Sequence, residues 1–370
     1  MGSRDALPVV EPLPWRRQLA HGARTVADLV DRDLLSPSEI ATAEAVSHRY
    51  ELLVSDYYLS LVDPDDPHCP IRKMALPDGA ELVVNTVERT DPIGDAAHSP
   101  APSIVHRYPD RALLIVTHRC PMFCRYCFRK VALNDGQIPL RQLEGAYDYL
   151  RRTPGIEEII LTGGDPLMLS TARLAAIFEA LRSIPSIKRI RIHSRMPVTL
   201  PMRLDAPLLE LFAAVRPLHL VTHFNHPREM THEARTAIEG VRGAGVVLAN
   251  QAVLLAGIND ELATQTALWR ELVDWGVRPY YLHHPDLTVG TQHFRVSLDQ
   301  GLALTRALRG AVSGLFQPTY VIDIPGGLGK VPVDSGYVVP NGPGRWWLTS
   351  PIDGRRLDYL DPGFEPSALG

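Results

Sequence analysis

The 370-residue sequence carries 38 Lys and Arg against 42 Asp and Glu, a formal net charge of -4, and is long enough for one large α/β domain with extensions. This charge balance gives no reason to expect binding to nucleic acid or to an anionic membrane surface. No apolar run approaches the roughly 20 residues needed to span a bilayer, and the first residues lack the apolar stretch of a signal peptide.

The first 100 residues predict a helical extension. Helical patterns cover residues 25–30 and 37–47, and a Pro- and Asp-rich stretch follows at residues 63–67. We therefore expect residues 1–100 to form a unit that precedes the main domain.

Residues 101–313 predict an α/β domain, because short β-branched apolar runs alternate with helix-like stretches about every 30 residues. We expect strands near residues 112–117, 156–162, 187–193, 218–223, 246–254 and 279–283. We expect helices at residues 140–152, 171–183, 206–214, 231–243, 263–275 and 298–313. Six such units predict a partial (β/α)6 TIM-like barrel, with residues 314–370 as a Gly- and Pro-rich extension that has no long helix.

Three of the four cysteines follow the first predicted strand, in the pattern CxxxCxxC formed by Cys120, Cys124 and Cys127. Three thiolates can hold three irons of a 4Fe–4S cluster and leave the fourth iron open. The alternatives are buried or free thiols, or part of a zinc site, although zinc would call for four ligands from paired motifs. Oxygen-sensitive thiolates indicate a reducing, cytoplasmic location, and we expect Cys69 to be a structural or incidental thiol.

Polar and glycine residues follow the predicted strands, where parallel barrels place their chemistry. Gly163-Gly164-Asp165 follows the second strand, and two glycines let the backbone approach a ligand closely. An isolated Gly-Gly-Asp is more often an ordinary turn. Other polar stretches occur at residues 193–197, 222–226, 250–251 and 283–286, so the sequence predicts one functional rim.

A glycine-rich segment near the C-terminus runs from Asp323 to Lys330. A lysine there can form a Schiff base with pyridoxal 5′-phosphate (PLP), which acts as an electron sink. From spacing alone, a surface lysine or a phosphate contact is equally compatible. The segment is not a P-loop, because no Ser or Thr follows Lys330.

Several ordered segments resemble the lysine 2,3-aminomutase family of radical S-adenosylmethionine (SAM), PLP-dependent enzymes, over roughly residues 60–340. The matching segments are 108–111, 120–129, 222–227, 250–255, 257–260, 293–295 and 325–330. The resemblance implies a partial six-unit barrel and an isomerase that moves an α-amino group to the β-carbon. It also implies three cofactors: a 4Fe–4S cluster, SAM and PLP.

The resemblance assigns a role to each matching residue. The cluster ligands would be Cys120, Cys124 and Cys127. PLP would be held by Lys330, Arg107, Tyr108 and Arg111. The residues around SAM would be Gly163, Gly164, Asp165, His223 and Gln251. Arg129 would bind the substrate carboxylate, and Asp286 and Asp323 would bind a distal ammonium group.

The acidic pair favours a basic amino acid, most simply L-lysine converted to β-lysine, although arginine or ornithine would also satisfy it. No cysteine follows Cys127, unlike in the longer lysine enzymes, which have a zinc site. Short chains without zinc resemble the branch that modifies a lysine of elongation factor P. That branch often lacks the glycine-lysine pattern, which is nearly intact here, so free lysine is favoured.

Two other classes of protein fit less well. An electron-transfer iron–sulfur protein would need a fourth cluster cysteine and no cofactor lysine, and an inactive relative would not keep the full residue set. The expected partners are a small amino acid substrate, an external electron donor of the flavodoxin or ferredoxin type, and a second copy of the chain in a homo-oligomer.

Overall fold

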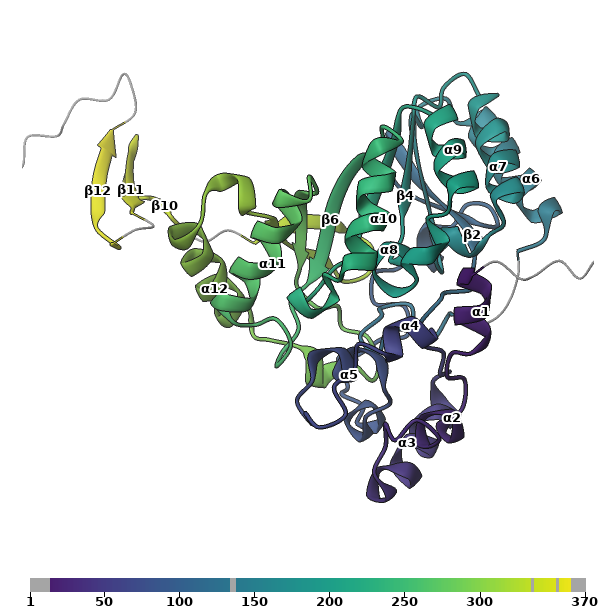
Figure 1. Ribbon diagram of the computed structural model, residues 1–370. Helices are drawn as coiled ribbons and strands as arrows, with labels where there is room; N and C mark the ends of the chain where they lie inside the picture. The colour runs from purple at the N-terminus through teal and green to yellow at the C-terminus, as the bar shows by residue number, and fades with distance from the viewer. Residues whose placement is uncertain (1–13, 134–137, 334–335, 351–352, 361–370) are drawn as a thin grey trace, which may run out of the picture.

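The computed structural model describes residues 14–133, 138–333, 336–350 and 353–360. Its main sheet has nine strands in sequential order, with β2 to β8 parallel and with β1 and β9 antiparallel at the two ends (Figure 1). The strands are β1 Ile104–Tyr108, β2 Arg111–Thr117, β3 Glu158–Gly163, β4 Arg189–His193, β5 Leu218–Thr222, β6 Val247–Val253, β7 Arg278–His283, β8 Thr319–Ile324 and β9 Gly329–Pro332. This curled sheet confirms the predicted α/β partial barrel.

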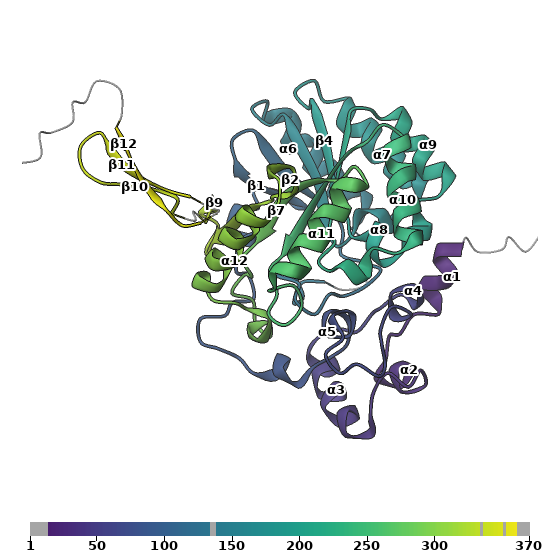
Figure 2. The ribbon, with the colours of Figure 1, turned by 60° about the vertical axis from the view of Figure 1, so that its left-hand side comes forward.

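Six longer helices cover the outer face of this sheet (Figure 2). They are α6 Leu140–Arg152, α7 Thr171–Arg182, α9 Ala206–Ala214, α10 His232–Gly243, α11 Leu262–Asp274 and α12 Leu298–Ala311. Local signals explain their bounds: Ser170 caps α7 by accepting from Arg173 N, and Asp205 caps α9 by accepting from Leu208 N. All six predicted helices and all six predicted strands are present with ends within two residues of those expected.

The strands β1, β8 and β9 were not predicted from the sequence. Strand β8 adds a seventh parallel strand, so the main sheet continues beyond residue 313. Strands β8 and β9 form an antiparallel hairpin whose register pairs Asp323 with Lys330. Lys330, expected at the end of a loop, therefore lies on a strand, and Gly326 and Gly327 form the turn with positive φ angles.

The N-terminal part packs beneath the open end of the barrel (Figure 1). Its helices are α1 Pro14–Ala20, α2 Val26–Val30, α3 Pro37–Arg49, α4 Asp56–Leu59 and α5 Pro70–Ala75, which confirms the helices predicted at 25–30 and 37–47. Two backbone hydrogen bonds tie it to the cysteine loop: Phe123 N donates to Leu53 O at 2.8 Å and Arg125 N to Met74 O at 3.0 Å. The N-terminal extension thus supports the cysteine loop.

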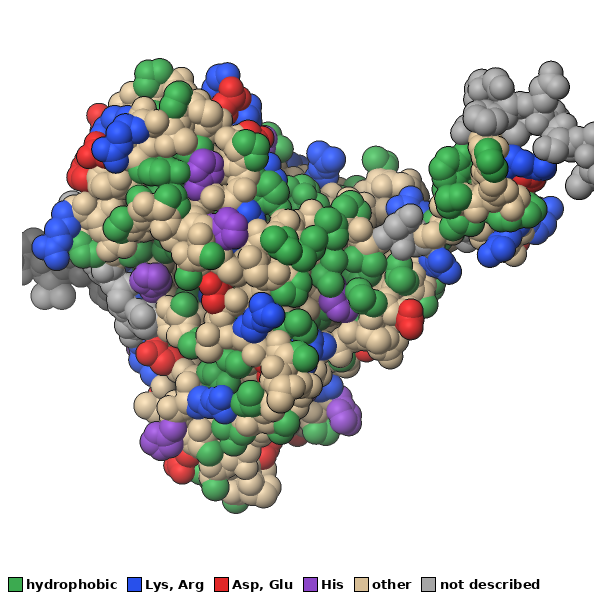
Figure 3. Space-filling model, turned by 180° about the vertical axis from the view of Figure 1, so that it is seen from behind, with side chains coloured by type: hydrophobic (Ala, Val, Ile, Leu, Met, Phe, Trp, Pro, Cys, Tyr) green, Lys and Arg blue, Asp and Glu red, His purple; other side chains and the backbone are tan. Residues whose placement is uncertain are grey.

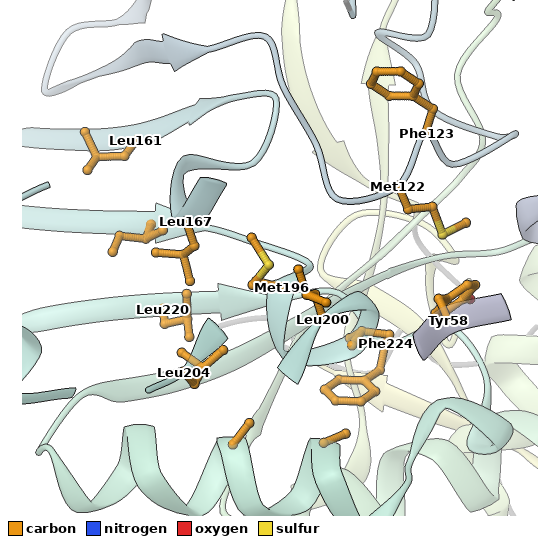
Figure 4. Close-up of a cluster of buried hydrophobic side chains, with 14 of the residues drawn as sticks. Tyr58, Met122, Phe123, Leu161, Leu167, Met196, Leu200, Leu204, Leu220 and Phe224 are labelled. Carbon is orange, nitrogen blue, oxygen red and sulfur yellow. The ribbon is translucent and has the colours of Figure 1, made fainter. Parts of the chain in front are cut away.

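A buried apolar cluster joins these parts (Figure 4). The cluster includes Tyr58 from α4 and Met122 and Phe123 from the cysteine loop. It also includes Met196, which begins the short helix α8 (Met196–Thr199), and Phe224 after β5. Each such buried side chain contributes about 1.5–3 kcal/mol. The loop is therefore fixed by core packing as well as by hydrogen bonds.

The last strands, β10 Val338–Pro340, β11 Arg345–Thr349 and β12 Arg356–Leu360, form a separate antiparallel sheet that projects from the barrel (Figures 1 and 2). On the face seen in Figure 3, acidic and basic side chains are interspersed, in line with the small net charge. No helix of the described residues is both long and apolar enough to cross a membrane.

Candidate active site

A cavity of about 390 Å³ opens at the carboxyl ends of the parallel strands. This volume is typical of a small-molecule site. Every residue proposed for the site from the sequence lines this cavity: Cys120, Cys124, Cys127, Lys330, Arg107, Tyr108, Arg111, Gly163, Gly164, Asp165, His223, Gln251, Arg129, Asp286 and Asp323. The fold therefore brings together residues as far apart in the sequence as Tyr108 and Lys330, which are joined by a hydrogen bond.

The three cysteines lie half-buried on one short loop between β2 and α6. The loop turns tightly, because Cys127 N donates to Cys124 O at 3.0 Å. Burial raises the pKa of the Cys127 thiol to about 11 and raises that of Cys120 as well. No three Cys, His, Asp or Glu side chains in the described ranges converge as ligands of a single metal ion. A set of three sulfurs at one cavity wall fits a 4Fe–4S cluster with one open iron.

A buried charge network supports this loop from outside the cavity. Arg125 pairs with Glu81 at 2.5 Å and Lys130 with the same carboxylate at 2.6 Å. Burial alone would raise the pKa of Glu81, but the two cations lower it below its usual value. Burial lowers the pKa of Lys130 to about 8. No local pattern in the sequence indicates this network, because Glu81 is far from both cations along the chain.

The glycines after β3 are required by close backbone packing. A Cβ on Gly163, whose φ is +113°, would lie 2.4 Å from Thr117 O, and one on Gly164 would lie 2.3 Å from Arg119 O. In addition, Gly164 N donates to Thr117 O at 2.7 Å. The glycine turn therefore lies directly against the start of the cysteine loop, which no residue with a side chain would allow.

Asp165 is held by protein groups. Its carboxylate accepts hydrogen bonds from Ser194 Oγ at 2.8 Å, Arg195 N at 2.8 Å and Leu167 N at 3.0 Å. Burial raises its pKa to about 6, although these hydrogen bonds oppose the rise. The described contacts of Asp165 therefore join the end of β3 to the end of β4.

Three half-buried histidines line the cavity and have a buried Nε2 atom without a partner among the described residues: His193, His223 and His283. Burial lowers the pKa of each, so the rings are neutral near pH 7. An unpaired buried nitrogen costs about 1–3 kcal/mol, and a bound ligand can recover that cost. Of the three, only His223 was proposed as a ligand contact from the sequence.

Lys330 lies at the centre of a polar group on one cavity wall. Its Nζ forms an ion pair with Asp323 and lies 3.1 Å from His283 Nδ1, and its backbone N donates to the Tyr108 hydroxyl at 2.8 Å. Burial opposes ionisation of Asp323, but His283 and Lys330 hold its pKa at about 2. The amine of Lys330 is thus held in place by a carboxylate.

Asp286 is the second carboxylate at this wall. Burial, and then the charge of Asp323, raises its pKa to about 7, although Lys330 and Arg129 act in the opposite direction. In the described part of the chain, no cation forms an ion pair with the Asp286 carboxylate. Of the two carboxylates at this wall, Asp323 is paired with Lys330 and Asp286 has no ion-pair partner among the described residues.

Two arginines of the site share one carboxylate. Arg129 Nη2 pairs with Asp95 at 2.7 Å, and Arg107 Nη2 pairs with the same carboxylate at 3.2 Å. The guanidinium carbon of Arg111 lies 3.8 Å from the Tyr108 ring centre. Asp95 was missed from the sequence because nothing local marks it. Asp95 thus pairs with Arg129, the residue expected to bind the carboxylate of the substrate.

The residues around Lys330 fit PLP. Lys330 supplies an amine, Arg107 and Arg111 supply positive charge for a phosphate, and the Tyr281 ring lies 5.5 Å from Lys330 Nζ. The Nε atom of Arg107 is buried without a partner among the described residues. An amine, an aromatic face and guanidinium groups, one of which keeps an unpaired Nε atom, are the groups a phosphorylated aromatic aldehyde requires.

Comparison with known proteins gives two matches to family models: the radical SAM superfamily over residues 114–267, and lysine-2,3-aminomutase over residues 305–350. The L-lysine 2,3-aminomutase of Fusobacterium nucleatum is 39% identical over 94% of this chain and 82% of its own length. The L-lysine 2,3-aminomutase of Clostridium subterminale is 40% identical over 88% of this chain and 79% of its own length. The glutamate 2,3-aminomutase of Clostridioides difficile is 36% identical over 89% of this chain and 78% of its own length. The first family match contains the three cysteines and the second contains Lys330.

Proposed function

Because the chain belongs to the lysine 2,3-aminomutase family of radical SAM enzymes, we propose that it converts free L-lysine to β-lysine by moving the α-amino group to the β-carbon. The family makes the chain an isomerase that uses a 4Fe–4S cluster, SAM and PLP. The observation that supports the substrate is the half-buried acidic pair, Asp286 and Asp323, beside Lys330 in the same cavity as the cysteine loop.

We assign the three groups to three parts of the cavity. Cys120, Cys124 and Cys127 would hold the cluster, the Gly163–Gly164 backbone and the unpaired nitrogen of His223 would contact SAM, and Lys330 would bind PLP. When bound, these groups supply a hydrogen-abstracting radical and a conjugated ring that delocalises an unpaired electron. An external one-electron donor of the flavodoxin or ferredoxin type would be the partner.

The acidic wall supports a cationic substrate. Asp286 lies half-buried beside the charge of Asp323, and its raised pKa reflects the cost of ionising it there. A distal ammonium group placed between the two carboxylates would offset this repulsion and lower the pKa of Asp286. The two carboxylates would instead repel the side chain of glutamate.

Arg129 would orient the other end of the substrate. It presents a planar guanidinium group suited to a carboxylate, and Asp95 holds it at 2.7 Å. A substrate carboxylate would exchange with Asp95 or share the guanidinium group with it. Binding at both ends would fix the distance from the α-carbon of the substrate to Lys330.

Apolar side chains complete the cavity and limit the access of water. Leu133, Phe294 and Met122 line it, and all three are buried. Exclusion of water protects reactive radicals from side reactions. This lining supports radical chemistry on the substrate inside the barrel.

The proposal is tested by competition among amino acids. The reconstituted chain, supplied anaerobically with SAM, reductant and PLP, would be given equal L-lysine, L-ornithine, L-arginine and L-glutamate. The β-amino products have the masses of their substrates and would be separated from them by chromatography. We expect β-lysine to dominate. Preferred formation of β-glutamate would refute the acidic-pair argument. If no free amino acid is converted but a lysine of elongation factor P is, the chain would belong to the protein-modifying branch.

A further inference from the structure

Arg195, which follows β4, bonds directly to the cysteine loop. Its Nη1 donates to Cys124 Sγ at 2.9 Å and its Nε donates to the carbonyl oxygen of His223 at 3.2 Å. Its backbone N donates to Asp165 Oδ2 at 2.8 Å. Only 8% of Arg195 is exposed, so this is a buried cation in contact with one of the three sulfurs.

A buried carboxylate balances the charge of Arg195 through its other terminal nitrogen. Arg195 Nη2 forms an ion pair with Glu229, which has no exposed surface. Glu229 also accepts hydrogen bonds from the Tyr58 hydroxyl at 2.6 Å and from Asn225 N at 2.6 Å. These bonds fix the guanidinium group, so its position at the sulfur does not depend on a mobile side chain.

We propose that Arg195 sets the reduction potential of the cluster by donating a hydrogen bond to Cys124 Sγ, and that Glu229 limits the size of this effect. The inference rests on the proposed ligation by Cys120, Cys124 and Cys127. Reduction adds one electron from the external donor and hence one negative charge to the cluster. A positive charge and a hydrogen bond at a ligand sulfur stabilise that reduced form more than the oxidised form.

Arg195 and Glu229 are both buried. Their charges should therefore act strongly on the cluster, because charges interact more strongly where water is absent. Arg195 bonds to the sulfur itself, whereas Glu229 acts on the sulfur only across the guanidinium group. The effect of Arg195 on the potential should therefore exceed the opposing effect of Glu229. Arg195 is a positioning residue that makes the cluster easier to reduce.

The structure offers a matched control in Arg203. This side chain is 1% exposed and donates to Leu167 O and Leu169 O, both at 2.9 Å, and it pairs with Asp205 at 3.3 Å. Like Arg195, it is a buried arginine that follows β4. Its partners are oxygen atoms, so Arg203→Gln should reproduce the structural cost of losing a buried arginine without the change at the sulfur.

The test measures the midpoint potential of the cluster by electron paramagnetic resonance during a redox titration, without SAM or substrate. Arg195→Gln should lower the ratio of reduced to oxidised cluster at a fixed potential about tenfold, which is about 59 mV for one electron. Glu229→Gln should shift the midpoint the opposite way, and Arg203→Gln should leave it at the parent value. Iron content is measured for every variant.

The proposal would be overturned if Arg195→Gln with full iron content had the same midpoint potential as the parent. It would also be overturned if Arg203→Gln shifted the midpoint potential as much as Arg195→Gln does. If Arg195→Gln fails to fold or to bind iron, Glu229→Gln decides, and an unchanged or lower midpoint in that variant overturns it. A parent chain that assembles no cluster on its three cysteines would instead refute the proposed cluster site, so the two failures are distinguishable.

Discussion

Replacement of Asp286 by Asn tests how the cavity selects its substrate. The change keeps the size of the side chain and removes an ionisable carboxyl group beside Asp323. A charge-assisted hydrogen bond contributes about 1.5–3 kcal/mol, so kcat/KM for L-lysine should fall about 10- to 150-fold. The kcat/KM for L-norleucine, which has the same carbon chain without the distal ammonium group, should fall far less.

The pH dependence provides an independent measure of the same group. In the proposed binding mode, ionised Asp286 would bind the ammonium group, and its pKa in the substrate-free protein is about 7. The parent kcat/KM for lysine should therefore fall as the pH drops below about 7, because the protonated carboxyl group no longer attracts the cation. In Asp286→Asn this dependence should be absent.

The same raised pKa has a consequence for stability. Folded Asp286 holds its proton up to a pKa of about 7, above the ordinary value of 3.8 that applies to the unfolded chain, so the folded state binds more protons between these values. Stability of the parent should thus decline as the pH rises from about 4 to 7, by up to about 1.4 kcal/mol per unit from this group. Asp286→Asn should lack this decline.

The assays are steady-state product analysis by chromatographic separation of β-lysine from L-lysine, and urea unfolding across pH. The control is Asp274→Asn, which removes one acidic charge from the last residue of α11, a position that does not line the cavity. This variant should keep the parent activity and the parent pH profile. An Asp286→Asn variant that uses lysine as well as the parent, with the parent pH profile, would refute the reasoning.

Three further predictions concern the cofactor-binding parts. Cys124→Ala should lose most bound iron and the release of 5′-deoxyadenosine from SAM, whereas Cys69→Ala should keep both, and normal iron binding by Cys124→Ala would contradict the cluster assignment. Lys330→Ala should abolish the pyridoxyl group fixed by borohydride while the iron content stays at the parent level; peptide mapping of that group to another lysine would rule out Lys330. Gly164→Ala forces a contact of 2.3 Å with Arg119 O and should cost about 1–3 kcal/mol in unfolding free energy, measured by urea titration, and an unchanged stability would show that the turn can relax.

Much of the barrel could be predicted because its signals are local. The helices α6 and α9 begin and end at the residues expected from apolar spacing and caps, such as Asp205 before α9. The hairpin of β8 and β9 escaped prediction because glycines interrupt it and β9 has only four residues. Its stability depends on pairing with β7, which no local pattern records.

The same distinction applies to the site. Residues on a short motif, such as the three cysteines, could be named from spacing, and the family resemblance supplied the roles of Lys330 and Asp286. The ion-pair partners could not be found, because Asp95 lies 34 residues from Arg129 and Glu229 lies 171 residues from Tyr58. Charged residues of these types are common, and only the fold determines which of them meet.

The most direct test of the account uses L-lysine that carries deuterium at the β-carbon. If the cysteine loop and Lys330 act on one substrate in one cavity, anaerobic turnover should yield β-lysine and transfer deuterium into recovered SAM. Formation of β-lysine with no deuterium in SAM or 5′-deoxyadenosine would contradict the account.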